Sequence, residues 1–461
     1  MNDDEKFQRE LRGTLDGLAR EPAPDRLVAR VSEIPSREPS TWTSGIRHRL
    51  SGGSFASAFG LLAVGIAIVA VAILARPGAI TPSVGASPTP TPLSSAAPTA
   101  STAPTASPAP TASSAAVATP SPKPQGSTVP KSFQPVSATF VSSADGWVLG
   151  SVPCSGGQCP AIVRTTDGGS TWSSINAPKT TIEVPGGLTG KGISGLRFAN
   201  GSNGWAFGPE LWATHDGGTT WSRVTIAGLP ATAAVAALET ARGTVHAVAY
   251  DGDTNFRIAT SPIAADDWHL GNLRLPVGAG PVPQIQLVLA GDAGWVLQND
   301  RTVVNGARLL AAAWQSWDPP CLDVTGPAVL AASTATHVIA VCDVGMMSTP
   351  QGEHLYVSND GGVTFSTVGA RMPINSAVAL ATPDGSTIVV AGSKSTGAAL
   401  VTSFDGGRTW PSTLSAGMVQ IAQLGFTTRT QGLVITSDAS SGAGKMLMTH
   451  DGGRTWTRVA F

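Results

Sequence analysis

Short apolar runs separated by turn residues fill the C-terminal two-thirds of the chain. "DGWVLGS" (145–151), "NGWAFG" (203–208), "AGWVLQ" (293–298) and "QGLVITS" (431–437) are such runs, and "TVHAVAY", "THVIAVC" and "STIVVAG" occupy the same place elsewhere. Runs of this length between Gly and Asp clusters are typical of β-strands. Each run has another apolar run before it and two after it. The pattern therefore predicts an all-β region of similar four-stranded units.

One motif ends the third strand of most units. "RTTDGGSTW" (164–172) returns as "ATHDGGTTW", "VSNDGGVTF", "TSFDGGRTW" and "MTHDGGRTW". The aspartates and closing aromatic residues are Asp167 and Trp172, Asp216 and Trp221, Asp360 and Phe365, Asp405 and Trp410, and Asp451 and Trp456. An Asp side chain can accept turn N–H groups, and glycine adopts positive φ without strain. We interpret the motif as a structural turn rather than a catalytic device.

Two decayed copies complete the series. "SPIAADDW" ends at Trp268 and "LAAAWQSW" ends at Trp317, which places Ile263 and Ala312 at the aspartate position. Successive aspartate positions are then 45 to 49 residues apart. Seven units of four strands predict a seven-bladed β-propeller over residues 132–461. An open solenoid is the alternative, but a closed ring leaves fewer exposed strand edges.

The motif resembles the Asp-box, or BNR, repeat of bacterial sialidases, sortilin-type receptors and some glycoside hydrolases. The fuller unit "NGWAFGPELWATHDGGTTW" is most similar to the repeat of photosystem II assembly-factor propellers and their bacterial relatives. This resemblance implies a propeller whose boxes are structural turns away from the active face.

A sialidase-like glycoside hydrolase is one alternative function that the resemblance raises. Such enzymes carry an arginine triad, a Tyr–Glu nucleophile pair, an Asp acid, and a Phe-Arg-Ile-Pro motif before the first box. Here Phe256-Arg257-Ile258 lies in the third unit, Ala259 replaces the proline, and the chain has two tyrosines. We assign no catalytic residue.

The first 131 residues have a different composition. Residues 1–49 are polar, with two short predicted helices, and residues 50–76 contain the uncharged run Ser54–Ala75. A run of this length predicts a transmembrane helix, with a buried core helix as the alternative. Arg37, Arg47 and Arg49 precede it and only Arg76 follows closely, which predicts a cytoplasmic N-terminus and an external C-terminal domain.

Residues 77–131 form a Pro-, Ser-, Thr- and Ala-rich segment that predicts a disordered stalk. This layout resembles a transmembrane sensor with an anti-sigma-like tail, which is a second alternative function, although residues 1–49 contain no zinc-binding motif. We therefore expect a single-pass protein of a bacterial cell membrane with a monomeric external propeller.

Charge and cysteine content limit the chemistry. The formal net charge is −1 and 13% of residues are charged, without a basic cluster, so we expect no nucleic-acid partner. Cys154 and Cys159 flank a short loop, and Cys321 and Cys342 would close a longer one. External cysteines favour disulfides, and neither spacing is typical of zinc. We expect no metal and no cofactor.

Candidate binding residues lie in the loops between second and third strands and in those from one unit to the next, because both kinds of loop meet on one face of a propeller. Gly208–Glu210 and 393–397 are two such loops, and the candidate residues are Asp251, Asp253, Asn255, Arg301, Met346, Met347, Glu353 and His354. The "DGDTN" aspartates also fit the start of a calcium loop, but no bidentate Glu follows at the required distance, and a hairpin turn explains them better. Functional residues concentrate in loops on a rigid scaffold. The sequence thus predicts non-catalytic binding of a protein or an envelope glycan.

Overall fold

A computed structural model gives the structure of this chain. It describes residues 127–155, 157–183, 187–188, 190–278, 283–322, 326–343, 353–369, 371–394, 397–414, 418–438 and 443–461. The predicted cytoplasmic tail (1–49) with its two helices, the predicted transmembrane run, most of the predicted stalk, and Met346 and Met347 lie outside these residues. Within the described part, no helix is long and apolar enough to cross a membrane.

Twenty-eight strands follow one another along the described part of the chain. The first three sheets contain β1 (Gln134–Phe140), β2 (Gly146–Cys154), β3 (Gly157–Thr165), β4 (Ser173–Ile175), β5 (Gly195–Phe198), β6 (Gly204–Phe207), β7 (Leu211–Thr214), β8 (Ser222–Arg223), β9 (Ala234–Ala241), β10 (Thr244–Tyr250), β11 (Asn255–Pro262) and β12 (His269–Pro276). The other four contain β13 (Gln284–Ala290), β14 (Ala293–Asp300), β15 (Thr302–Leu310), β16 (Ala313–Trp317), β17 (Ala328–Ala332), β18 (Val338–Asp343), β19 (Glu353–Ser358), β20 (Ser366–Val368), β21 (Ser376–Ala381), β22 (Ile388–Lys394), β23 (Gly397–Ser403), β24 (Ser412–Leu414), β25 (Met418–Phe426), β26 (Gly432–Asp438), β27 (Gly444–Thr449) and β28 (Thr457–Arg458).

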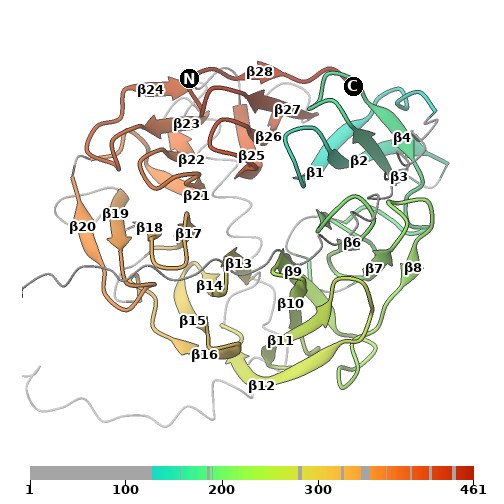
Figure 1. The fold of residues 1–461 in the computed structure, drawn as a ribbon, viewed down its shortest axis with the longest axis horizontal. Coiled ribbons are helices and arrows are strands. Elements are labelled where there is room, and N and C mark those ends of the chain that lie inside the picture. The colour runs from blue at the N-terminus through green and yellow to red at the C-terminus, as the bar shows by residue number, and fades with distance from the viewer. Residues whose placement is uncertain are drawn as a thin grey trace, which may run out of the picture. The chain divides into compact units, whose positions relative to one another are not determined.

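Seven antiparallel sheets stand around a ring, and each is made of four consecutive strands (Figure 1). We number these sheets as blades 1 to 7 in chain order. The first strand of each blade is innermost and the fourth is outermost. The predicted all-β, seven-bladed propeller with four-stranded blades is confirmed.

The ring closes without exchanging a strand, because β25 to β28 form the last blade alone. The Gln423 side chain of β25 bonds both backbone groups of Ala138 in β1, through Oε1 at 2.8 Å and Nε2 at 2.7 Å. Gln431 Nε2 also donates to the Ser143 carbonyl. Side-chain amides therefore join the first blade to the last.

Buried side chains gather between neighbouring blades. The described residues form seven apolar clusters, one at each seam of the ring. Trp147, Trp205 and Trp295, all in second strands, are fully buried. Apolar second strands thus supply the core, as expected for strands packed on both faces.

The two decayed units still form complete blades, β9 to β12 and β13 to β16. In blade 4, Ala311 and Ala312 have φ of 47° and 64° and make a two-residue hairpin instead of a box turn. Trp317 is the last residue of β16, whereas the box aromatic residues precede their fourth strands. The unit is where the spacing predicts it, but its turn is of a different kind.

Candidate functional site

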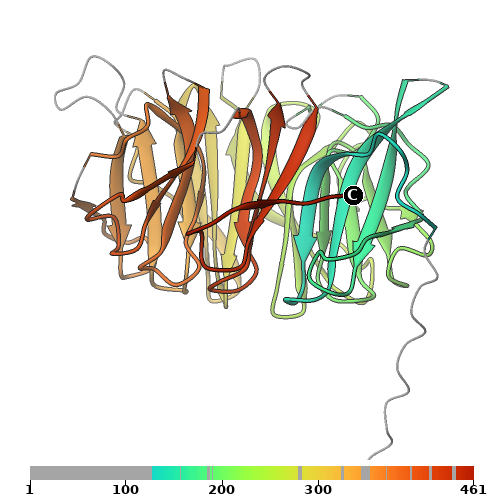
Figure 2. The same ribbon diagram turned by 90° about the horizontal axis from the view of Figure 1, so that it is seen from above.

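The propeller has two faces with different turns (Figure 2). The box turns lie beside the turns between first and second strands of the same blade, because a box glycine N–H bonds a carbonyl there. The five pairs are Gly168 with Ala144, Gly217 with Ser202, Gly361 with Thr336, Gly406 with Ser386, and Gly452 with Thr430. We call this the box face. The hairpins between second and third strands define the opposite side, the loop face.

Each box aspartate is bonded within its own turn. Asp167 Oδ1 accepts the Thr171 N–H at 2.9 Å, and Asp167 Oδ2 accepts the Thr171 hydroxyl at 2.5 Å. Thr165 Oγ1 donates to the same carboxylate and accepts the Gly169 N–H. These bonds, chiefly the one from the Thr171 hydroxyl, lower the pKa of Asp167 to about 2. The carboxylate therefore stays ionised and its oxygens are occupied locally.

The same bonds recur at the other four boxes. The carboxylates of Asp216, Asp360, Asp405 and Asp451 accept from Thr220, Thr364, Thr409 and Thr455 respectively. The closing rings pack against aromatic side chains at Phe140–Trp172, Phe198–Trp221, Trp317–Phe365 and Phe426–Trp456, and Trp410 packs against the apolar cluster between blades 5 and 6. The repeated geometry is that of a turn that locks two strands.

On the loop face, the first aspartate of "DGDTN" closes the β10–β11 hairpin. Asp251 Oδ1 accepts the backbone N–H groups of Asp253, Thr254 and Asn255 at 3.1, 3.0 and 3.0 Å. Asn255 Nδ2 donates to the other carboxylate oxygen. No group of three His, Cys, Asp or Glu side chains in the described residues could hold a metal ion. The bonds favour the hairpin-turn alternative over a calcium loop.

The remaining candidate binding residues differ in exposure: one is on the surface, one is buried, and one is half-buried. Arg301 is exposed in the β14–β15 turn, with φ of 63°. Glu353 is only 3% exposed, and its Oε1 accepts the Ala377 N–H of blade 6 at 2.8 Å. Burial, with a smaller contribution from Asp343, raises the pKa of Glu353 to about 7. His354, the next residue, is half-buried, and its ring stacks on that of Tyr356 with the two ring centroids 6.5 Å apart.

Both predicted disulfides are present. Cys154–Cys159 links the ends of the β2–β3 hairpin, where Cys154 is exposed on the loop face. Cys321–Cys342 is buried and ties the segment after β16 to β18 in the next blade. The first holds a projecting hairpin and the second fixes a seam.

A cavity of about 310 Å³ opens on the loop face between blades 2 and 3. Its wall includes the apolar side chains of Leu211, Val224, Ile226 and Leu229. The Glu210 carboxylate also lines it, with its side chain 6% exposed, and pairs at 3.3 Å with Arg223, which is 55% exposed.

Glu210 is held from several directions. Its Oε2 accepts the Trp212 indole N–H and the Thr180 hydroxyl. A buried carboxylate is tolerated when it is paired and hydrogen-bonded in this way. The sequence placed the Gly208–Glu210 loop on this face, but it did not show that the β8–β9 segment completes a cavity there.

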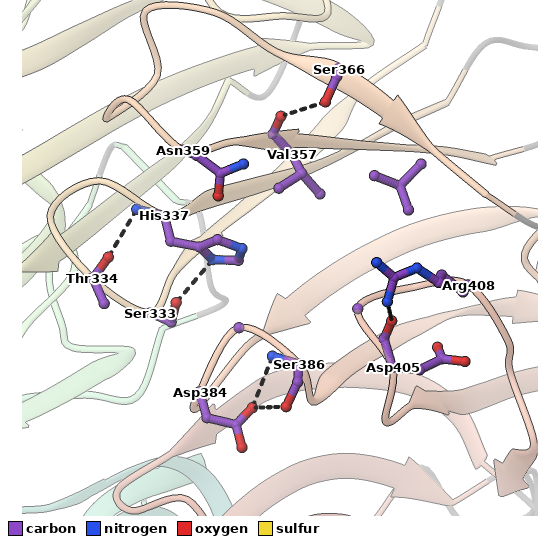
Figure 3. Close-up of a pocket in the computed structure, with 13 residues that line it drawn as sticks. Ser333, Thr334, His337, Val357, Asn359, Ser366, Asp384, Ser386, Asp405 and Arg408 are labelled. Carbon is purple, nitrogen blue, oxygen red and sulfur yellow. Dashed lines mark hydrogen bonds between the residues drawn. The ribbon is translucent and has the colours of Figure 1, made fainter.

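A second cavity, of about 610 Å³, opens on the box face between blades 5 and 6 (Figure 3). His337 and Asn359 line it from blade 5, and Asp384, Ser386 and Arg408 line it from blade 6. None of these residues is a sequence-predicted site residue. The sequence motifs indicated only structural turns on the box face. The cavity becomes visible only where the two blades pack together.

The Phe256-Arg257-Ile258 segment is part of β11. Phe256 is fully buried, and Arg257 Nη2 donates to the Gly271 carbonyl at 2.6 Å. The guanidinium group is therefore used within its own blade.

No protein-family model matches the chain, and no curated protein is similar to it in sequence. Among solved structures, YCF48 from Cyanidioschyzon merolae is similar at 16% identity and a TM-score of 0.48, over 71% of this chain and 98% of that chain. YCF48 bound to D1 peptide is similar at 15% identity and a TM-score of 0.48, over 70% of this chain and 95% of that chain. A GH74 enzyme from Niastella koreensis is similar at 12% identity and a TM-score of 0.42, over 71% of this chain and 59% of that chain. Such values do not indicate a shared ligand or activity.

Proposed function

We propose that this chain is a membrane-anchored binding protein whose propeller engages a protein partner outside the membrane through its loop face. The uncharged run Ser54–Ala75 supplies the anchor, and the segment 77–131 supplies the stalk. The box turns on the other face serve the fold, because their carboxylates are occupied within each turn. The loop face is the surface that we assign to the protein partner.

The cavity between blades 2 and 3 is the observation that supports this proposal. Protein interfaces concentrate binding energy where an apolar side chain enters a desolvated pocket bordered by polar groups. Leu211, Ile226 and Leu229 provide the apolar wall, and exposed Arg223 stands at its rim as a charged contact. The disulfide-linked hairpin ending at Cys154 adds a stiff projecting element on the same face.

Cross-linking in cells tests the proposal on the full chain. A photo-reactive amino acid at Ala231, an exposed residue lining the cavity, is expected to yield a defined protein adduct in the membrane fraction. The same amino acid at Val363, 65% exposed on the box face, is the matched control and is expected to yield no such adduct.

The Arg223→Glu change should then weaken the Ala231 adduct, since it reverses the rim charge. Equal adducts from both positions, or none at Ala231, would rule out a loop-face partner. Recovery of the chain from the soluble fraction would contradict the anchor.

A further inference from the structure

Two blades carry a Trp–Arg pair between their second and third strands. In blade 1, Trp147 pairs with Arg164, and in blade 4, Trp295 pairs with Arg308. Arg308 Nη1 crosses the seam and donates to the Gly361 carbonyl of the next box at 3.0 Å. The Arg164 guanidinium lies 4.9 Å above the Trp147 ring. A Trp–Arg pair therefore occupies these two seams.

Blade 5 has smaller residues at the same positions. Ile339 pairs with Val357, which in turn pairs with Ser366 of the fourth strand. Val357 and Ser366 both line the box-face cavity. The volume that an arginine side chain takes at the blade 4–5 seam is left open at the blade 5–6 seam.

Polar side chains line part of this space, and the rest of its wall is apolar. The His337 ring points into it, with Nδ1 held by Ser333 Oγ at 3.0 Å (Figure 3). Asn359 lines the same wall, and its side chain makes no hydrogen bond within the described part of the chain. Opposite lie Arg408, whose Nη1 donates to the Asp405 carbonyl, and Asp384, whose Oδ1 accepts the Ser386 and Thr387 N–H groups.

We propose that this cavity binds a neutral saccharide of one or two sugar rings. Sugar hydroxyls both donate and accept hydrogen bonds, and the cavity offers both functions: donors from Arg408, an acceptor at Asp384, and either function from the Asn359 amide. Val357 and Val368 provide apolar surface for the C–H face of a ring. The site is on the opposite face from the proposed protein contact and does not depend on it.

Charge argues against an anionic ligand. Two carboxylates, Asp384 and Asp405, line the cavity beside one guanidinium, so an anion would meet net negative charge. An apolar ligand would leave the Asn359 amide and the outward N–H groups of Arg408 without a partner on the ligand side.

The test uses the full-length protein in detergent and saturation-transfer NMR with maltose, cellobiose, N,N′-diacetylchitobiose and glucuronate at millimolar concentration. At least one neutral disaccharide is expected to bind, and glucuronate is expected to bind more weakly. Val357→Arg should reduce binding by at least about tenfold, because the new side chain fills the cavity as Arg308 fills its own seam.

Two further variants keep the result interpretable if Val357→Arg folds poorly. Asn359→Ala should weaken binding several-fold with an unchanged melting temperature, since this exposed side chain makes no hydrogen bond to the described residues. Val363→Arg places the same charge on the same face at a residue 65% exposed and should leave binding unchanged. Absence of binding by all three disaccharides, tighter binding of glucuronate, or full binding by Asn359→Ala and Val357→Arg would overturn the proposal.

Discussion

Glu353 illustrates how a residue from a predicted loop can have an interior role. Its Oε1 bonds blade 6, while its Oε2 makes no hydrogen bond to the described residues. Burial therefore favours the protonated form and raises its pKa to about 7 from 4.5. Because the folded state holds this proton more tightly than the unfolded chain, ionisation near neutral pH costs stability.

The Glu353→Gln variant tests this at the residue scale. Below pH 4.5 both states of the wild type are protonated, so the variant and wild type should be similar in stability. As pH rises from 4.5 through about 7, the wild type should lose up to about 3 kcal/mol that the neutral amide retains. Urea denaturation at pH 4.5 and pH 8 measures the difference; a gap that is the same at both pH values would contradict the assigned pKa.

The two disulfides connect the strands in different ways: one closes a hairpin within a blade, and the other joins two blades. The Cys154–Cys159 disulfide closes a separation of 5 residues at an exposed hairpin. The Cys321–Cys342 disulfide spans 21 residues, is buried, and joins two blades. Both pairs were predicted from cysteine order and compartment, yet their mechanical roles differ because one lies at a tip and the other in a core.

Replacing each pair by alanines tests this at the element scale. Loss of the buried disulfide should cost about 3 kcal/mol from loop entropy, with added loss of packing. Loss of the hairpin disulfide should cost about 2 kcal/mol or less, since no core contact is lost. Equilibrium unfolding of the two double variants makes the comparison; a larger effect at the hairpin would be inconsistent with these roles.

At the scale of the whole molecule, the ring depends on contacts between residues far apart in sequence. Gln423 and Ala138 are separated by 285 residues and exchange two hydrogen bonds. Gln286 plays a related part within the ring, where its Oε1 accepts the Leu330 N–H at 2.9 Å. The chain runs directly from blade 4 into blade 5. Blades 7 and 1 are not consecutive in the chain, so only contacts between distant residues hold them together.

Gln423→Ala should therefore open the closing seam. Loss of two bonds to buried backbone groups is expected to cost about 1–3 kcal/mol. Amide hydrogen exchange should accelerate in β1 and β26, which the closing seam joins. Gln286→Ala is the matched control and should leave exchange in β1 unchanged, because its seam lies on the other side of the ring. Unchanged exchange at the closing seam in Gln423→Ala would show that other contacts hold the ring.

The sequence alone determined the number of blades and the place of their strands, and it marked four cysteines as disulfide candidates, whose pairing the structure gives. These features are local and repeated: a turn such as Asp167–Trp172 encodes its own geometry, and a fixed spacing counts the units. The sequence placed Glu353 in a loop but could not show that it is buried against blade 6. It also could not reveal the cavity at Val357, since that depends on which side chains of one blade face the next. Only the tertiary structure decides such contacts, because they join side chains across a seam rather than along the chain.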